Sequence, residues 1–125
     1  MRKKRKMVDC VEYLSVDAPF DRVERLEDKQ QKYIREYVRN KEYRVVGTIR
    51  RHGFSMNDVN RQWKQIACMI HKKQVQGVVI ANMAAISMDL PDAYAKVGQI
   101  VAAGGIVVTV DEGPLRMGIK GWLYE

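Results

Sequence analysis

Hydrophobic and polar residues along this chain follow two periods in turn, and the pattern predicts strands that alternate with helices. Runs rich in β-branched residues are typical of strands, and they occur at 8–16, 42–49, 76–81 and 106–110. Between these runs, apolar residues recur every three or four positions, as on one face of a helix, over 21–40, 59–72 and 91–105.

Local signals indicate where some of these elements begin and end. Pro19 is expected to stop the first strand, because proline cannot donate a hydrogen bond to a central ladder. Asp21 is well placed to cap the first helix, and the pair Gly104 and Gly105 to end the third. Residues 111–114 are expected to form a turn, followed by a weak strand or a docked tail.

The alternation predicts an α/β fold. Strands joined by helices of this length need right-handed crossovers, which produce a mostly parallel sheet. We therefore expect a three-layer domain with four to five strands and helices on both faces of the sheet. A basic flexible arm over 1–7 would precede this single domain over 8–125, and we expect no C-terminal DNA-binding domain.

The net charge of +7 is unevenly distributed along the chain. Without the N-terminal arm, the chain has 17 basic and 15 acidic residues, so the net charge of the folded part is close to zero. The arm could contact DNA weakly and without sequence preference, or it could be a solubilising tail. Its five cations are Arg2, Lys3, Lys4, Arg5 and Lys6.

Two further features limit the class of protein. No apolar run reaches the roughly 20 residues that a membrane helix needs, so we expect a cytoplasmic protein without membrane contact. Cys10 and Cys68 lack the spacing of metal ligands, and we expect buried, reduced thiols.

The order of motifs resembles the N-terminal catalytic domain of the serine recombinases, the resolvase and invertase family. The resemblance covers roughly residues 11–112. It includes Gln30 in the first helix and three segments of sequence: YLSV at 13–16, HGFSMNDVNRQWKQI at 52–66 and GVVIANMAAIS at 77–87. It implies a resolvase-like fold with its site beyond the carboxyl ends of the strands.

The family's chemistry uses a serine that attacks a DNA phosphodiester, and arginines that hold the phosphate. Carried over by position, Tyr13 and Val16 match the family. The nucleophilic serine falls on Asp17, and a motif arginine on Ser15. The aspartate and the two arginines of the third-strand motif fall on Met83, Ala84 and Ser87.

Only Arg61, with Ser55 and Gln30 near it, keeps the family's residue type. The resemblance therefore implies a protein associated with DNA recombination that has no catalytic residues for strand exchange. It would act through weak DNA contact and association with a recombinase subunit or with a second copy of itself. Whether the chain has any other enzymatic activity stays open.

Other interpretations use residues at the same edge of the sheet. Arg51, His52, Ser55 and Arg61 could bind a phosphate or another anion, or could belong to a solvated basic loop. A metal-dependent enzyme could use Asp17, Asp111 and Glu112, since Mg²⁺ prefers carboxylate ligands. The basic arm could instead serve a nucleic-acid accessory factor. The leading interpretation needs no cofactor and no resident metal.

Overall fold

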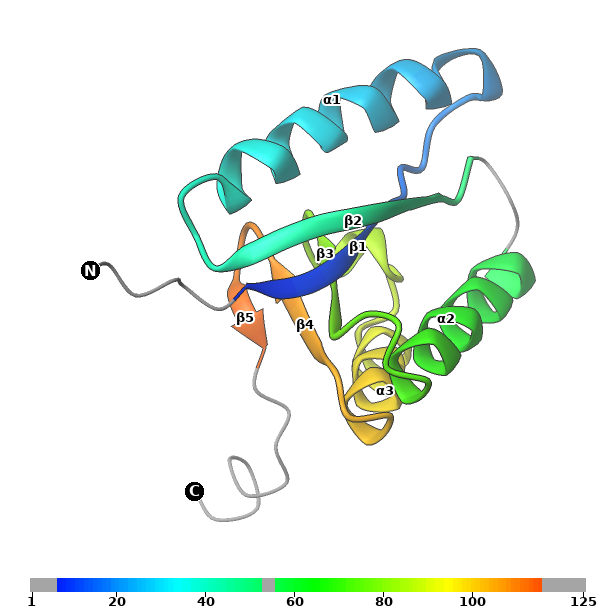
Figure 1. Ribbon diagram of the computed structural model, residues 1–125. Coiled ribbons are helices and arrows are strands. Elements are labelled where there is room, and N and C mark those ends of the chain that lie inside the picture. Colours follow the sequence, from blue (N-terminus) through cyan, green and yellow to red (C-terminus); the bar gives the residue numbers. More distant parts are fainter. Residues whose placement is uncertain (1–6, 53–55, 116–125) are drawn as a thin grey trace.

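The computed structural model describes residues 7–52 and 56–115 of the chain (Figure 1). The elements follow in the order β1 (Val8–Leu14), α1 (Phe20–Val38), β2 (Tyr43–Arg50), α2 (Met56–His71), β3 (Gly77–Ile80), η1 (Met83–Ala85), α3 (Leu90–Ala102), β4 (Ile106–Thr109) and β5 (Gly113–Leu115). This order confirms the predicted α/β class. Residues 1–6 of the predicted basic arm, Ser55 and the tail beyond Leu115 lie outside the described residues.

The strands form one five-stranded sheet in the order β2-β1-β3-β4-β5. The first four strands are parallel, and β5 pairs with β4 in the antiparallel sense. The turn predicted over 111–114 extends too far, because β5 already starts at Gly113. Pro114 is tolerated there since β5 is an edge strand, where a missing backbone donor costs little.

Helices cover both faces of the sheet. Figure 1 shows α1 alone on one side, and α2 and α3 on the other. Alternate residues of β1 divide between the two layers: Cys10 and Leu14 pack toward α1, whereas Val11 and Tyr13 pack toward α2 and α3. This is the period of two that a strand imposes on a sheet covered on both faces.

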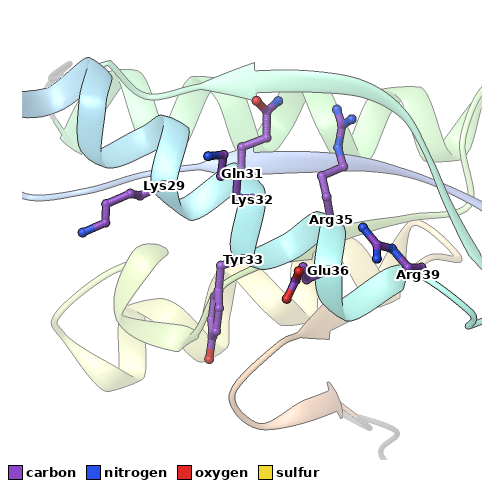
Figure 2. Close-up of a pocket in the computed structure, with 7 residues that line it drawn as sticks. All are labelled: Lys29, Gln31, Lys32, Tyr33, Arg35, Glu36 and Arg39. Carbon is purple, nitrogen blue, oxygen red and sulfur yellow. The ribbon is translucent and has the colours of Figure 1, made fainter.

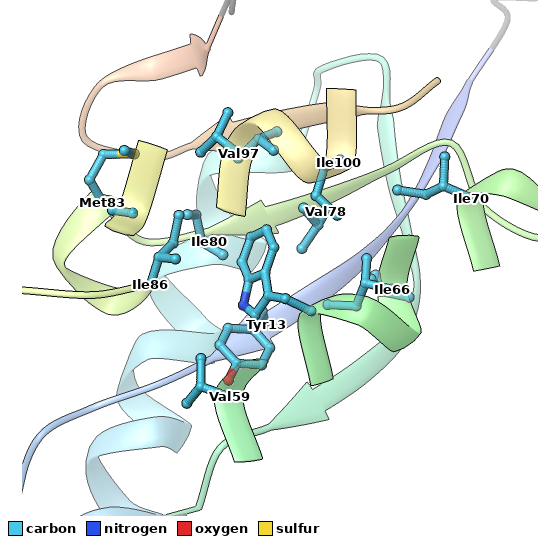
Figure 3. Packing of buried hydrophobic residues seen from close by; sticks show 14 of the residues in the cluster. Tyr13, Val59, Ile66, Ile70, Val78, Ile80, Met83, Ile86, Val97 and Ile100 are labelled. Atoms are coloured by element: carbon cyan, nitrogen blue, oxygen red, sulfur yellow. The ribbon is translucent and has the colours of Figure 1, made fainter. Parts of the chain in front are cut away.

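The larger apolar cluster lies between the sheet and the helices α2 and α3 (Figure 3). Trp63 of α2 is fully buried there and meets the edge of the Tyr13 ring, with ring centroids 5.6 Å apart. The predicted apolar stripe of the second helix is therefore the side that fills the core.

The predicted start of α1 differs from the observed one, whereas the predicted end of α3 agrees with the structure. The prediction that Asp21 caps α1 is wrong: the cap is Pro19, and Asp21 lies in the first turn, where its carboxylate still favours the helix dipole. Gly104 follows α3 with a φ of 96°, a conformation that favours glycine, so the expected stop is confirmed. Within the described residues no helix is long and apolar enough to cross a membrane.

Candidate functional site at the carboxyl edge of the sheet

A hollow of about 280 Å³ opens beyond the carboxyl ends of the strands, and it joins three separate segments of sequence. Its lining comes from the chain after β1, from the chain after β2, and from η1 with its connection to α3. The lining residues are Ser15, Asp17, Arg51, Ala84, Ser87, Met88 and Asp89. The structure thus brings together four of the five positions that the resemblance assigned to chemistry.

Hydrogen bonds from α1 and β2 fix the end of β1 at this hollow. The side-chain amide of Gln30 accepts from the backbone N–H of Ser15 at 2.7 Å and donates to its carbonyl at 2.9 Å. The Arg51 N–H donates to the carbonyl of Leu14 at 2.8 Å. The side chain of Arg51 lies over the hollow, with its Nη1 3.5 Å from the Ser15 hydroxyl. Ser15 itself is buried.

Polar side chains shape the segment after β3 without adding a cation. The Asn82 Oδ1 accepts from the backbone N–H of Ala85 at 3.0 Å and so caps η1. The Asn82 Nδ2 donates to Asp111 at 3.0 Å. The hydroxyl of Ser87 accepts from the backbone N–H of Asp89 at 3.1 Å. Amide, hydroxyl and carboxylate groups therefore hold this segment, and none of these hydrogen bonds involves a cation.

The two methionines of this segment have different environments. Met83, the fifth assigned position, is buried and belongs to the core beside α3. Met88 lines the hollow and is 79% exposed. Core packing therefore accounts for Met83, and the apolar rim of the hollow comes from Met88.

The charge of the lining disfavours a phosphate. Arg51 is the one cation among these described lining residues, whereas Asp17 and Asp89 are both acidic. The formal balance is one positive against two negative charges, or −1. A dianionic or monoanionic phosphate entering this hollow would meet two carboxylates, and a single guanidinium does not compensate for both.

The basic residues at the end of β2 and directly after it do not all face the hollow. The backbone N–H of His52 donates to Glu27 of α1 at 2.8 Å, and the His52 Nδ1 lies 3.6 Å from the same carboxylate. Arg50 contacts Glu27 at 3.4 Å and Asp28 at 2.9 Å. The hydrogen bond to Asp28 is the main cause of the raised pKa of Arg50. A buried acid of α1 therefore holds part of this basic segment.

Arg61 lies apart from this group. It projects from α2, 76% exposed, and pairs with Asp58 at 3.0 Å. Of the predicted anion-binding residues, only Arg51 lines the hollow within the described part of the chain. Anion binding stays a prediction, and its geometry would rest on Arg51 and the serines beside it.

The acids proposed for a metal site do not come together. In the described ranges no three His, Cys, Asp or Glu side chains gather where they could hold a metal ion. Asp111 instead accepts hydrogen bonds from Tyr33 and Asn82. The bond from Tyr33 is the main reason why the pKa of that phenol is raised. The alternative interpretation, a metal site formed by Asp17, Asp111 and Glu112, therefore finds no support in the described residues.

Sequence reasoning missed two buried acids, Glu12 and Glu27. Glu12 interrupts an otherwise apolar strand, and Glu27 follows Val23 by four positions on the apolar stripe of α1. A charged residue at a core position is the signal that could have revealed both. Asp89 was missed as well, because its part in the hollow depends on the turn after η1.

The strand order, the helices on both faces and the hollow beyond β1 and β3 define a resolvase-like α/β domain. Comparison with solved structures confirms this fold. A resolvase family site-specific recombinase from Streptococcus pneumoniae matches with a TM-score of 0.69 and 16% identity, over 85% of this chain and 74% of that one.

Two further structures agree. The N-terminal catalytic domain of TP901-1 integrase matches with a TM-score of 0.65 and 15% identity, over 84% of this chain and 78% of that one. The C-terminal catalytic domain of ISC1926 TnpA, an IS607-like serine recombinase, matches with a TM-score of 0.64 and 18% identity, over 94% and 76%. No family model and no curated protein matches the sequence. The likeness is therefore one of fold.

Proposed function

We propose that this chain is a serine-recombinase-like protein of DNA recombination that does not cleave DNA and acts by associating with another subunit. The composition of the hollow carries the proposal. By the resemblance in sequence, Asp17 falls at the position of the attacking serine, and Ala84 and Ser87 at those of two arginines. All three line one hollow, whose formal charge is −1.

The proposed loss of chemistry follows from what phosphoryl transfer requires. A nucleophilic hydroxyl must reach the phosphorus atom, and cations must stabilise the charge that grows on the phosphate oxygens. Removing a single such donor typically lowers the rate about 100- to 1,000-fold. Here the hydroxyl and two cations are replaced together, and Asp17 adds repulsion.

Exposed apolar side chains near the hollow support the association. Phe20 is 80% exposed at the start of α1, and its ring lies 6.3 Å from that of His52. Met88 lines the hollow, and Leu90 and Tyr94 follow it on α3, four positions apart and both exposed. Large apolar side chains in water are a common feature of surfaces that bind another protein.

Sedimentation at micromolar concentration tests the association, with the chain alone and mixed with an active serine recombinase encoded in the same genome. We expect a complex that weakens at least tenfold in the double variant Phe20→Ser/Met88→Ser. The control is Val46→Ser/Ile106→Ser, which changes two exposed apolar residues on the strands β2 and β4. Absence of any complex, or equal weakening by the control, would refute the association.

The loss of chemistry needs a separate measurement. The chain is incubated with nicked duplex DNA that carries the partner's recombination site, and denaturing electrophoresis then reveals any covalent protein–DNA adduct. The active recombinase is the positive control. We expect no adduct with this chain, and an adduct on any of its serines would contradict the proposal.

A further inference from the structure

The outer face of α1 carries a row of cations, which we call the α1 cationic stripe. Its members are Arg22, Arg25, Lys29, Lys32 and Arg39, spaced three, four, three and seven positions apart. These intervals keep the residues on one side of a helix. All five are exposed, opposite the buried side formed by Val23, Glu27, Ile34 and Val38.

The stripe is not neutralised by its neighbours. No member has an ion-pair partner within the described part of the chain, whereas Arg35 is occupied by Glu12 and Arg50 by Glu27 and Asp28. The exposed acids of α1 are Asp21, Glu24, Asp28 and Glu36, and Asp28 pairs with Arg50 of β2. Five positive charges against the three other acids leave a formal balance of +2.

Part of the stripe surrounds a depression of about 770 Å³ on α1 (Figure 2). Lys29, Lys32 and Arg39 line it together with Arg35 and Glu36. The sign of this charge is opposite to that of the hollow at the strand ends. The surface with an excess of positive charge therefore lies on α1, whereas the lining of the hollow carries a formal charge of −1.

We infer that the α1 cationic stripe binds the phosphate backbone of double-stranded DNA. The stripe extends from Arg22 to Arg39, the residue that directly follows the last helical residue, or about 25 Å, and a duplex presents roughly 15 phosphate charges over that length. Long, exposed Lys and Arg side chains suit such a line of charge. The inference extends the DNA contact of the proposed function, and its test is independent of subunit association.

Composition favours a duplex over other polyanions. An interface with an acidic protein needs an apolar centre, and no member of the stripe is apolar. Single strands are held largely by stacking on aromatic rings. Tyr33 is the aromatic residue of the depression, and its hydroxyl is engaged with Asp111.

Fluorescence anisotropy with a labelled duplex of arbitrary sequence tests the inference in the full-length chain. The variant Arg25→Gln/Lys29→Gln/Lys32→Gln removes three charges and keeps helix propensity nearly constant. We expect affinity at low salt to fall by about tenfold or more, and the slope of log K against log salt to become shallower by up to about 3.

The matched control removes three exposed charges at the other side of the sheet, in the variant Lys64→Gln/Lys72→Gln/Lys73→Gln. The basic arm is present in both variants, so its contribution cancels. We expect the control to bind as the unmodified chain does. Equal weakening by both variants would show that net charge alone drives binding, and would overturn the inference.

Two further outcomes would also overturn it. One is absence of duplex binding by the unmodified chain at low salt. The other is competition by poly-glutamate as strong as that by unlabelled duplex, which would identify an acidic polypeptide as the partner.

Discussion

The buried carboxylate of Glu12 allows a quantitative test of what holds α1 to the sheet. Glu12 is completely buried in β1 and accepts four hydrogen bonds. Gln31 donates at 2.6 Å, Thr48 at 2.7 Å, and the Nη2 and Nε of Arg35 at 2.7 and 3.1 Å. The hydrogen bond to Glu12 is also the main cause of the raised pKa of Arg35.

Arg35→Met keeps an unbranched apolar stem and nearly the same helix propensity but removes the cation and two donors. Breaking a buried ion pair costs about 3–5 kcal/mol, because the remaining charge is unpaired. The Arg35 side chain is 52% exposed, so water replaces part of the lost interaction. With two donors left on Glu12, we expect the free energy of unfolding to fall by about 2 kcal/mol.

Urea denaturation followed by circular dichroism measures this loss. With a slope of about 2 kcal/mol per molar urea, the midpoint should fall by about 1 M. Arg39→Met is the matched control: it makes the same substitution four residues later, at an exposed side chain without an ion pair in the described structure. Its effect should stay within about 0.5 kcal/mol.

A second substitution separates charge from packing. In the Arg35→Met background, Glu12→Gln removes the unpaired charge and retains an acceptor, so it should recover part of the lost stability. Equal midpoints for Arg35→Met and Arg39→Met would refute the reasoning. So would a failure of Glu12→Gln to restore any stability, because the penalty would then not come from an uncompensated carboxylate.

Two further predictions concern titratable groups. Burial, with a smaller contribution from Asp9, raises the pKa of the Cys10 thiol to about 12, whereas Cys68 is exposed. A thiol reagent should therefore modify only Cys68 in the native chain and both cysteines in denaturant. The ammonium of Lys96, 2.7 Å away, lowers the pKa of Asp92 below 3.8, so its carboxylate stabilises the fold above that pH and loses this effect as pH falls through the folded pKa. Urea titrations between about pH 6 and pH 2 should show the stability difference between the chain and Asp92→Asn shrinking in acid, and a constant difference would contradict the assignment.

The alternation of strands and helices could be predicted because each element has its own local period. The ends were less predictable. Asp21 has a favourable residue type for a cap, but the helix already begins at Phe20, immediately after Pro19. Gly113 and Pro114 have turn composition, yet pairing with β4 places them in an edge strand. In both cases the neighbouring structure outweighs residue preference.

The sequence predicted where the candidate site lies in the fold, but it did not predict the net charge of the residues that line it. Parallel strands end at one edge, so Ser15, Asp17 and Ala84 were expected to lie together, and they line one hollow with Arg51. The direction of His52 depends on Glu27, an acid that lies on another element. Tertiary packing decides such hydrogen bonds between residues of different elements, so the local sequence pattern does not predict them.

Helix α1 connects the two surfaces through its opposite sides. Its inner side fixes the end of β1, since Gln30 holds both backbone groups of Ser15 at the hollow. Its outer side carries cations that have no ion-pair partner among the described residues. Because the first function depends on buried hydrogen bonds and the second on exposed side chains, substitutions in the stripe leave the hollow intact. The stripe variant can therefore lose DNA affinity while its subunit association stays unchanged, and this separation distinguishes a helix with two roles from a fold that has been destabilised.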